Sequence, residues 1–170
     1  MESAMSRVQL ALRVADLEGS IAFYTKLFGT EPAKLRPGYA NFAIAEPPLK
    51  LVLIQGEPGQ DTQMDHLGVE VEDTTQVDAA TQRLKDAGLA TFSENDTSCC
   101  YAVQDKVWVR GPGMEPWEVY VVKADADNLG KSAIDQQNPQ AACACGPSSS
   151  DQTAGRTTQP VTAATVPGCC

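Results

Sequence analysis

The 170-residue chain is short of positive charge. It carries 13 Lys and Arg residues against 22 Asp and Glu residues, a formal net charge of -9, and its basic residues do not cluster. Binding to nucleic acid or to an anionic membrane needs concentrated positive charge, which releases counterions from phosphate groups. The composition therefore disfavours nucleic acid and membranes as partners.

Long hydrophobic runs are also missing. The first 15 residues alternate between apolar and polar side chains, and nowhere do about 18 apolar residues follow one another, the length that suggests a membrane-spanning helix. Neither a signal peptide nor a transmembrane segment is predicted. We therefore expect a cytoplasmic protein.

Aromatic residues are missing from the last part of the chain. All of them lie at or before Tyr120, while residues 124–170 are rich in Ala, Gln, Ser, Thr, Pro and Gly. Such a segment cannot bury enough apolar surface to offset its chain entropy. The sequence predicts one folded domain over residues 1–123 and a flexible tail over residues 124–170. The tail carries four cysteines: Cys143, Cys145, Cys169 and Cys170.

What the chain does contain is an internal repeat. Residues 9–16 (QLALRVAD) are echoed 57 positions later by residues 66–73 (HLGVEVED). Each copy alternates like a strand and ends in an Asp that can cap a helix, and the helical spacing that follows stops at Gly29 or Gly88. Strand-like runs then cover residues 39–45, 49–54, 101–109 and 117–122.

Two copies of strand, helix and about three strands predict an α+β fold, because a doubly wound parallel sheet needs helices between successive strands. The β-α-β-β-β pattern taken twice resembles the vicinal-oxygen-chelate fold of glyoxalase I, bleomycin-resistance proteins and extradiol dioxygenases. The resemblance implies a metal-binding cup with ligands on the first and last strands of each module. The positions it implies are Gln9, His66, Lys50 and Glu118, of which Lys50 cannot coordinate a metal while protonated.

The remaining three side chains supply an amide, an imidazole and a carboxylate with coordination positions left open, which is the logic of non-haem Fe(II) triads. The usual ligand of the fold at the first position is histidine. Gln9 departs from it and supplies a weaker neutral oxygen donor. We therefore expect this position to affect the affinity for the metal or the choice of metal.

The local pattern around two of these residues also suits a metal site. His66 shares the less apolar face of its strand with Gly68. Glu118 lies in the apolar run WEVYVV, where a carboxylate needs a cation to compensate its desolvation. Two structural alternatives remain: His66 as a core residue, and a salt bridge between Glu118 and Lys50.

The adjacent cysteines Cys99 and Cys100 follow the turn-forming residues 95–98. Neighbouring residues on a regular strand point to opposite faces, so the pair can chelate one atom only where the backbone leaves strand geometry, and a loop at residues 95–98 would allow this. A disulfide would be strained, because adjacent Cα atoms lie about 3.8 Å apart, and it would be readily reduced in the cytosol.

Two free thiolates form a soft bidentate site, suited to soft metals and to trivalent arsenic rather than to Mg or Ca. Zinc is a weaker alternative, because residues 1–123 lack a four-donor zinc motif. The remaining alternative is that the thiols are incidental and bind no ligand.

Five stretches of the chain together resemble the carbon-arsenic lyase family: SRVQLALRVADLEGSIAFYTKLFG, YANFAIAEPPLKLVL, MDHLGVEVED, NDTSCCYAVQDKVWV and PWEVY. The resemblance covers essentially the whole predicted domain, and the cysteine pair followed by YAVQDK is specific. It implies an Fe(II)-dependent dioxygenase, with dioxygen as co-substrate, that cleaves the carbon-arsenic bond of methylarsenite or reduced aromatic arsenicals and releases arsenite. In this interpretation Cys99 and Cys100 bind the arsenic, and Gln9, His66 and Glu118 bind the iron.

Other functions stay open. A non-catalytic protein that sequesters cadmium or arsenic would use the same thiols with an empty cup. A glyoxalase-like isomerase is less favoured, because Lys50 stands where that chemistry uses a carboxylate. Tyr39 and Tyr101, with Phe42 and Trp108, are candidates for lining the pocket, but because a β-rich core uses aromatics anyway, a core role is the default expectation for them. A monomer and a homodimer are both compatible with two modules in one chain.

Overall fold

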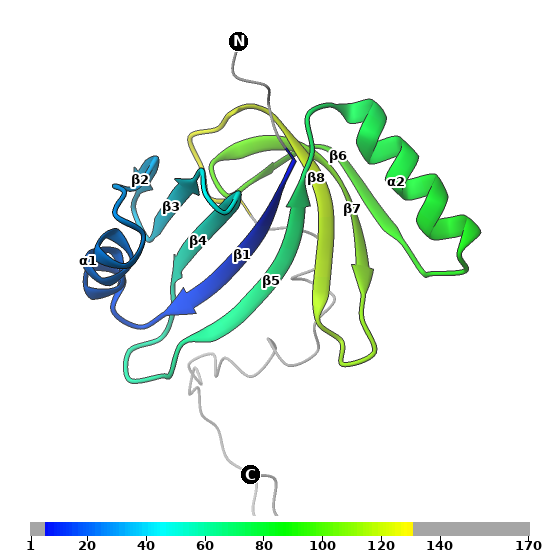
Figure 1. Cartoon of the computed structure of the whole chain (residues 1–170). Coiled ribbons are helices and arrows are strands. Elements are labelled where there is room, and N and C mark those ends of the chain that lie inside the picture. Colours follow the sequence, from blue (N-terminus) through cyan, green and yellow to red (C-terminus); the bar gives the residue numbers. More distant parts are fainter. Residues whose placement is uncertain (1–5, 131–170) are drawn as a thin grey trace, which may run out of the picture.

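Eight strands form one mixed sheet in which the two halves of the chain lie edge to edge (Figure 1). The computed structural model describes residues 6–130. The helices in this part of the chain are α1 (Leu17–Phe28) and α2 (Thr74–Asp86), and neither is long and apolar enough to cross a membrane. The strands are β1 (Arg7–Val14), β2 (Lys34–Arg36), β3 (Tyr39–Ile44), β4 (Leu49–Gln55), β5 (Gln63–Glu70), β6 (Phe92–Cys99), β7 (Ala102–Arg110) and β8 (Pro116–Asp125).

The strand order is β2-β3-β4-β1-β5-β8-β7-β6, so each half of the chain contributes four adjacent strands. The two first strands, β1 and β5, pair antiparallel at the centre of the sheet. Each also pairs in parallel with the last strand of its own half, β1 with β4 and β5 with β8. The predicted α+β fold of two β-α-β-β-β modules is confirmed, and the sheet curls into a half-barrel (Figure 1).

Both helices begin at the predicted Asp caps. The side chain of Asp16 accepts a hydrogen bond from the Gly19 N–H, and that of Asp73 accepts one from the Gln76 N–H. Each bond satisfies a backbone donor that has no partner within the helix. The helix α1 ends at Gly29, whose φ of 64° is the left-handed conformation that terminates helices.

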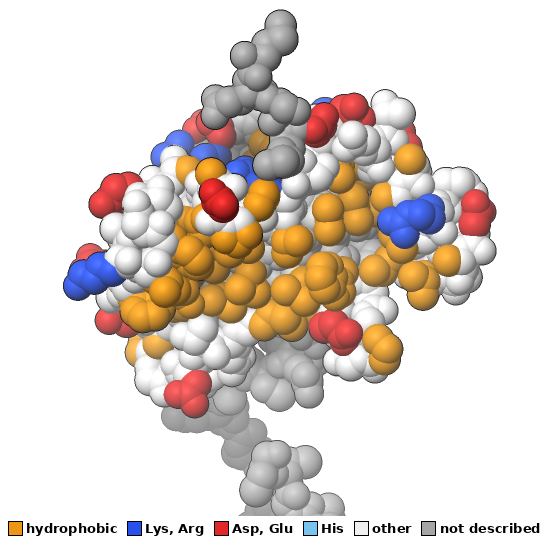
Figure 2. Space-filling model, viewed as in Figure 1, with side chains coloured by type: hydrophobic (Ala, Val, Ile, Leu, Met, Phe, Trp, Pro, Cys, Tyr) orange, Lys and Arg blue, Asp and Glu red, His pale blue; other side chains and the backbone are white. Residues whose placement is uncertain are grey.

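The two faces of the sheet have different roles. On the helix face, α1 packs over a cluster that includes Phe42 and Leu51, and α2 packs over Val107 and Val121. Figure 2 shows hydrophobic side chains gathered between the two helices on this face. We call the opposite face of the sheet, to which the alternate residues of each strand point, the cup face. Phe42 lies in the core on the helix face, which agrees with the core role expected by default and not with a place in the pocket lining.

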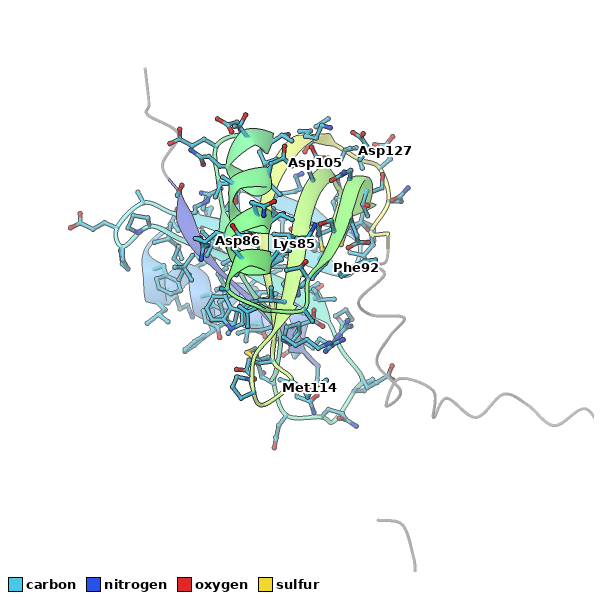
Figure 3. The ribbon with its side chains drawn as sticks, turned by 90° about the vertical axis from the view of Figure 1, so that its right-hand side faces the viewer. Lys85, Asp86, Phe92, Asp105, Met114 and Asp127 are labelled. Carbon is cyan, nitrogen blue, oxygen red and sulfur yellow. The ribbon has the colours of Figure 1, made fainter. Side chains whose placement is uncertain are left out.

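The folded part extends beyond the boundary predicted at residue 123. Strand β8 runs to Asp125, and the chain then crosses the turn between β6 and β7. There the Tyr101 N–H donates to the Asn128 carbonyl at 3.1 Å, and the Ala126 N–H donates to the Tyr101 carbonyl at 3.0 Å. Figure 3 shows Asp127 and Asp105 at one end of the molecule, with Met114 at the other. The tail cysteines Cys143, Cys145, Cys169 and Cys170 lie outside the described residues.

Candidate active site

One row of residues crosses the cup face on four neighbouring strands. Lys50 on β4 lies beside Gln9 on β1, Gln9 lies beside Gly68 on β5, and Gly68 lies beside Glu118 on β8. Gly68 leaves the space in which Gln9 and Glu118 meet, because a Cβ atom at Gly68 would lie 3.1 Å from Glu118 Cγ and 3.3 Å from Gln9 Nε2. His66 reaches the same place from two positions earlier on β5.

The side chains of Gln9, His66 and Glu118 form a buried triangle. Gln9 Nε2 lies 3.0 Å from His66 Nε2 and 2.8 Å from Glu118 Oε1. His66 Nε2 lies 3.3 Å from Glu118 Oε1, and the exposed fraction of Glu118 is 2%. The structure thus brings together the three residues that sequence reasoning selected as metal ligands.

The spacing of the triangle matches that of metal ligands, but the Gln9 atom that lies there is the amide nitrogen, which cannot bind a cation. Two ligands at about 2.1 Å from a metal ion and at a right angle to each other stand about 3.0 Å apart. His66 Nδ1 lies 2.6 Å from Asp65 Oδ1, a contact that fixes the imidazole with Nε2 toward the triangle. In residues 6–130 no group of three His, Cys, Asp or Glu side chains could hold a metal ion, so a site with three protein ligands here would need the amide oxygen of Gln9. These three residues fit Fe(II) with coordination positions left open.

The second oxygen of Glu118 is held by a lysine that sequence reasoning missed. Lys106 Nζ lies 2.8 Å from Glu118 Oε2, and Lys106 is fully buried. Burial alone would raise the pKa of Glu118, but the charges of Lys106 and His66 lower it well below its usual range. The alternative of a salt bridge between Glu118 and Lys50 is wrong, because Lys50 pairs with Glu70 at 3.1 Å.

The imidazole of His66 is also a packing group, since its ring meets that of Trp108 edge to face with centroids 5.5 Å apart. Burial alone would lower the pKa of His66, whereas the charge of Glu118 and the hydrogen bond to Asp65 raise it to about 10. Without a metal the ring is charged at neutral pH and balances Glu118, and its Nε2 proton then faces the Gln9 amide nitrogen, a second donor, at 3.0 Å. A metal ion at Nε2 would take the place of that proton.

A group of charged residues adjoins the triangle one row further along the strands. The Tyr120 hydroxyl contacts Gln9 Oε1 and lies 2.9 Å from Glu70 Oε2. Glu70 also pairs with Arg7 at 3.3 Å and with Lys50 at 3.1 Å. Burial raises the pKa of Glu70, but the charges of Lys50 and Arg7 outweigh it and lower the pKa, so this carboxylate is ionised at neutral pH.

Cys99 and Cys100 lie where β6 meets β7. The predicted loop over residues 95–98 is wrong, because these residues belong to β6, with an irregular register around Asp96. The turn is formed instead by Cys100 and Tyr101, whose φ angles of 56° and 58° are those of a two-residue type I′ hairpin. The predicted departure from strand geometry at the cysteine pair is confirmed. It brings the two Sγ atoms to 3.2 Å from each other.

The contact between the two thiols shifts their pKa values in opposite directions. The pKa of Cys99 is lowered because the Cys100 thiol donates a hydrogen bond to its sulfur, and the charge of Lys106 adds to this. The same contact, together with burial, raises the pKa of Cys100 well above its usual value. The pair therefore favours one thiolate beside one thiol, and the thiolate is the nucleophilic form.

Lys106 connects the thiol pair with the triangle. Burial alone would lower the pKa of Lys106, but the charges of Glu118 and of the two cysteines raise it, so its ammonium group serves both sites. Tyr39 and Tyr101 stand beside the thiols, with ring centroids 5.4 Å apart, in a buried cluster against which Cys100 packs. Ala11 belongs to the same cluster and follows Gln9 by two residues on β1, so the thiol pair and the triangle lie on the same face of the sheet, the cup face.

Residues 6–119 match the sequence profile of the Glyoxalase/Bleomycin resistance protein/Dioxygenase superfamily. A Thermomonospora curvata protein described as a trivalent organoarsenical cleaving enzyme is 76% identical over 128 residues, covering 75% of this chain and 85% of that protein. The cadmium-induced protein CadI of Mycobacterium tuberculosis is 60% identical over 126 residues, covering 74% and 82%. The Mn(II)-bound glyoxalase from Novosphingobium aromaticivorans shares the fold, with a TM-score of 0.52 and 20% identity, over 75% of this chain and 44% of that one.

Proposed function

The chain belongs to the glyoxalase/bleomycin resistance protein/dioxygenase superfamily, and we propose that it is a non-haem Fe(II)-dependent dioxygenase that cleaves the carbon-arsenic bond of trivalent organoarsenicals to release arsenite. The observation that carries the proposal is the presence in one cup of a buried three-donor triangle and a close thiol pair, 3.2 Å between sulfurs. The name of the Thermomonospora curvata relative supports the substrate class.

His66 Nε2, Glu118 Oε1 and the Gln9 amide oxygen would hold the iron. When bound, Fe(II) supplies the activation of dioxygen, the oxidant for breaking the carbon-arsenic bond. Lys106 holds Glu118 Oε2 at 2.8 Å, which leaves Oε1 to face the other two ligands. Asp65 orients the imidazole through Nδ1.

The thiol pair would capture the arsenic. The Cys99 thiolate attacks the arsenic of a methyl- or aryl-arsenous acid and one hydroxide leaves, while the Cys100 proton carries the second hydroxyl away as water. Two arsenic-sulfur bonds replace two arsenic-oxygen bonds, and the arsenic-carbon bond is untouched. This balance requires one thiolate and one thiol, which is the state that the opposed pKa shifts of the pair favour.

Bidentate capture also orients the substrate. Arsenic has three substituents, so fixing two of them on the hairpin sets the direction of the third, which is the carbon. The left-handed backbone at Cys100 and Tyr101 is held from outside the hairpin by hydrogen bonds with Ala126 and Asn128. A capture site on a turn that is fixed in this way can present the carbon in one direction.

A sequestering protein would need only the thiols. The buried triangle favours catalysis, because sequestration on sulfur gives no role to three converging donors of another kind. The two functions separate when the anaerobic full-length protein is mixed with Fe(II) and methylarsenite, oxygen is admitted, and the arsenic species are separated. Arsenite that forms only with both iron and oxygen supports the dioxygenase. Recovery of unchanged methylarsenite under all conditions supports sequestration and contradicts the proposal.

A further inference from the structure

The amide of Gln9 presents its nitrogen to the triangle. Its Nε2 lies 2.8 Å from Glu118 Oε1 and 3.0 Å from His66 Nε2, while its Oε1 contacts the Tyr120 hydroxyl on the opposite side. A neutral amide nitrogen is a donor and offers a cation no lone pair, whereas the carbonyl oxygen has two. A metal ion in the triangle therefore requires the amide to turn by half a rotation.

The Tyr120 hydroxyl has one proton and faces two acceptors. It contacts Gln9 Oε1 and lies 2.9 Å from Glu70 Oε2. Because a hydroxyl donates only one hydrogen bond, one of the two contacts has no proton in the present orientation of the amide. Turning the amide removes the conflict, since Gln9 Nε2 then donates to Tyr120 and Tyr120 donates to Glu70.

Glu70 is fixed as the acceptor at the end of this chain of hydrogen bonds. Arg7 lies 3.3 Å from both of its oxygens, and Lys50 lies 3.1 Å from Oε2. A carboxylate between two cations only accepts hydrogen bonds. Once the amide has turned, Glu70 can therefore accept the Tyr120 proton, which leaves a lone pair of Tyr120 to accept from Gln9 Nε2.

We propose that Tyr120, backed by Glu70, is the positioning residue that turns the Gln9 amide oxygen toward the metal ion. The inference rests on the proposed function, because it needs a metal ion at Gln9, His66 and Glu118. Tyr120 donates to the amide oxygen in the metal-free state, where the amide nitrogen serves Glu118, and it accepts from the amide nitrogen when metal is bound. An amide ligand suits this site because the Tyr120 hydroxyl can donate to the amide oxygen or accept from the amide nitrogen.

The test is an anaerobic calorimetric titration of the full-length protein with Fe(II). Tyr120→Phe keeps the buried ring, whose exposed fraction is 0%, and removes the partner of the amide. We expect the Fe(II) affinity to fall about ten- to a hundredfold, the usual cost of losing a group that orients a ligand. Tyr39→Phe is the matched control, because that buried hydroxyl accepts from Asn41 at 3.0 Å and not from a ligand. It should change the affinity by less than about twofold.

A double-mutant cycle shows whether Tyr120 acts through Gln9. In a Gln9→Ala background, Tyr120→Phe should cost no further affinity. Glu70→Gln is the second variant, because its amide can donate to Tyr120 and hold the Gln9 amide in the metal-free orientation, and it should also weaken Fe(II) binding. Unchanged affinity in Tyr120→Phe, or an equal loss with and without Gln9, overturns the proposal.

His66→Ala distinguishes a failure of this inference from a failure of the proposed function. If His66→Ala loses Fe(II) while Tyr120→Phe binds it like the unmodified chain, the metal site stands and the positioning role of Tyr120 is wrong. If His66→Ala retains Fe(II), the metal is bound elsewhere, and both the site and this inference are wrong.

Discussion

The two halves of the chain share one architecture and differ in chemistry. In the first half the neighbour of Gln9 on the last strand is Lys50, and in the second half the neighbour of Gly68 on the last strand is Glu118. The second half also supplies His66, Lys106 and both cysteines, whereas the first half supplies Gln9. The repeated architecture therefore forms both sides of the cup, whereas most of the functional side chains come from the second half.

The positions that the sequence repeat aligns with each other are not the positions that the strand pairing makes equivalent. The repeat aligns Gln9 with His66, because each precedes an Asp helix cap by seven residues. The strand pairing instead equates Gln9 with Gly68, so the triangle joins residues from two different rows of the sheet. The absent side chain at Gly68 is what lets these rows meet.

The largest difference in effect between the halves is expected for substitutions at Lys50 on β4 and at Glu118 on β8. Glu118→Gln and His66→Ala should each lower the Fe(II) affinity more than about a hundredfold and stop arsenite release, because losing a ligand costs more than losing its support. Lys50→Gln, at the corresponding place in the first half, should lower the affinity less than about tenfold. Calorimetry and arsenic speciation measure both. Equal losses at Lys50 and Glu118 would contradict the assignment of ligands.

The next largest effect concerns the thiols, which have no counterpart in the first half. Cys99→Ser and Cys100→Ser should each weaken methylarsenite binding about a hundredfold or more, because two linked attachments become one. Fe(II) affinity should stay within about twofold, since the iron ligands lie on other strands. Cys143→Ser is the control. Cleavage at the unmodified rate in the Cys99→Ser or Cys100→Ser variant would show that the thiol pair is structural.

Gly68→Ala tests the meeting of the two rows. Its Cβ would lie 3.1 Å from Glu118 Cγ and 3.3 Å from Gln9 Cβ, so the two ligands must move apart. We expect about a tenfold loss of Fe(II) affinity. The stability to denaturant should change by less than about 1 kcal/mol, because alanine restricts the unfolded chain more than glycine does while the crowded neighbours must shift. Retained affinity would mean that the site tolerates this displacement.

The opposed pKa shifts of the thiols predict a two-step titration. In a chain whose four tail cysteines are serine, absorbance of the thiolate at about 240 nm should rise first below the usual thiol pKa of about 8.5, and a second time well above it. The first step belongs to Cys99, whose pKa is lowered, and the second to Cys100, whose pKa is raised. Cys100→Ser should move the first step upward. A single step near the ordinary value would contradict the opposed pKa shifts.

The smallest effect is expected from the tail. Truncation after Gly130 should leave turnover within about twofold, because it removes only residues outside the described fold. Truncation after Lys123 also removes Ala126 and Asn128, which hydrogen-bond the Cys100–Tyr101 turn. This shorter chain should therefore bind methylarsenite more weakly than the chain truncated after Gly130. Loss of turnover in the longer truncated chain would give Cys143, Cys145, Cys169 or Cys170 a part in the reaction.

Local signals made most of the fold predictable from the sequence. Asp caps, glycine stops and alternating apolar residues are short-range features, and the helices α1 and α2 follow them. Strand β6 was not predicted, because it lies at the sheet edge and its sequence, FSENDTSC, has no apolar alternation. Lys106 was not predicted because its contact with Glu118, 12 residues later, depends on the register of the β7–β8 hairpin. Its spacing of two from Trp108 on one strand was the available signal for a shared face.

The most direct test of the account is arsenic X-ray absorption on the anaerobic complex with Fe(II) and methylarsenite, before and after oxygen is admitted. The account predicts two arsenic-sulfur bonds and one arsenic-carbon bond before oxygen, and loss of the arsenic-carbon bond after it. Arsenic that keeps its carbon after oxygen, or that shows no bond to sulfur before it, would contradict capture by Cys99 and Cys100 followed by cleavage at the iron site.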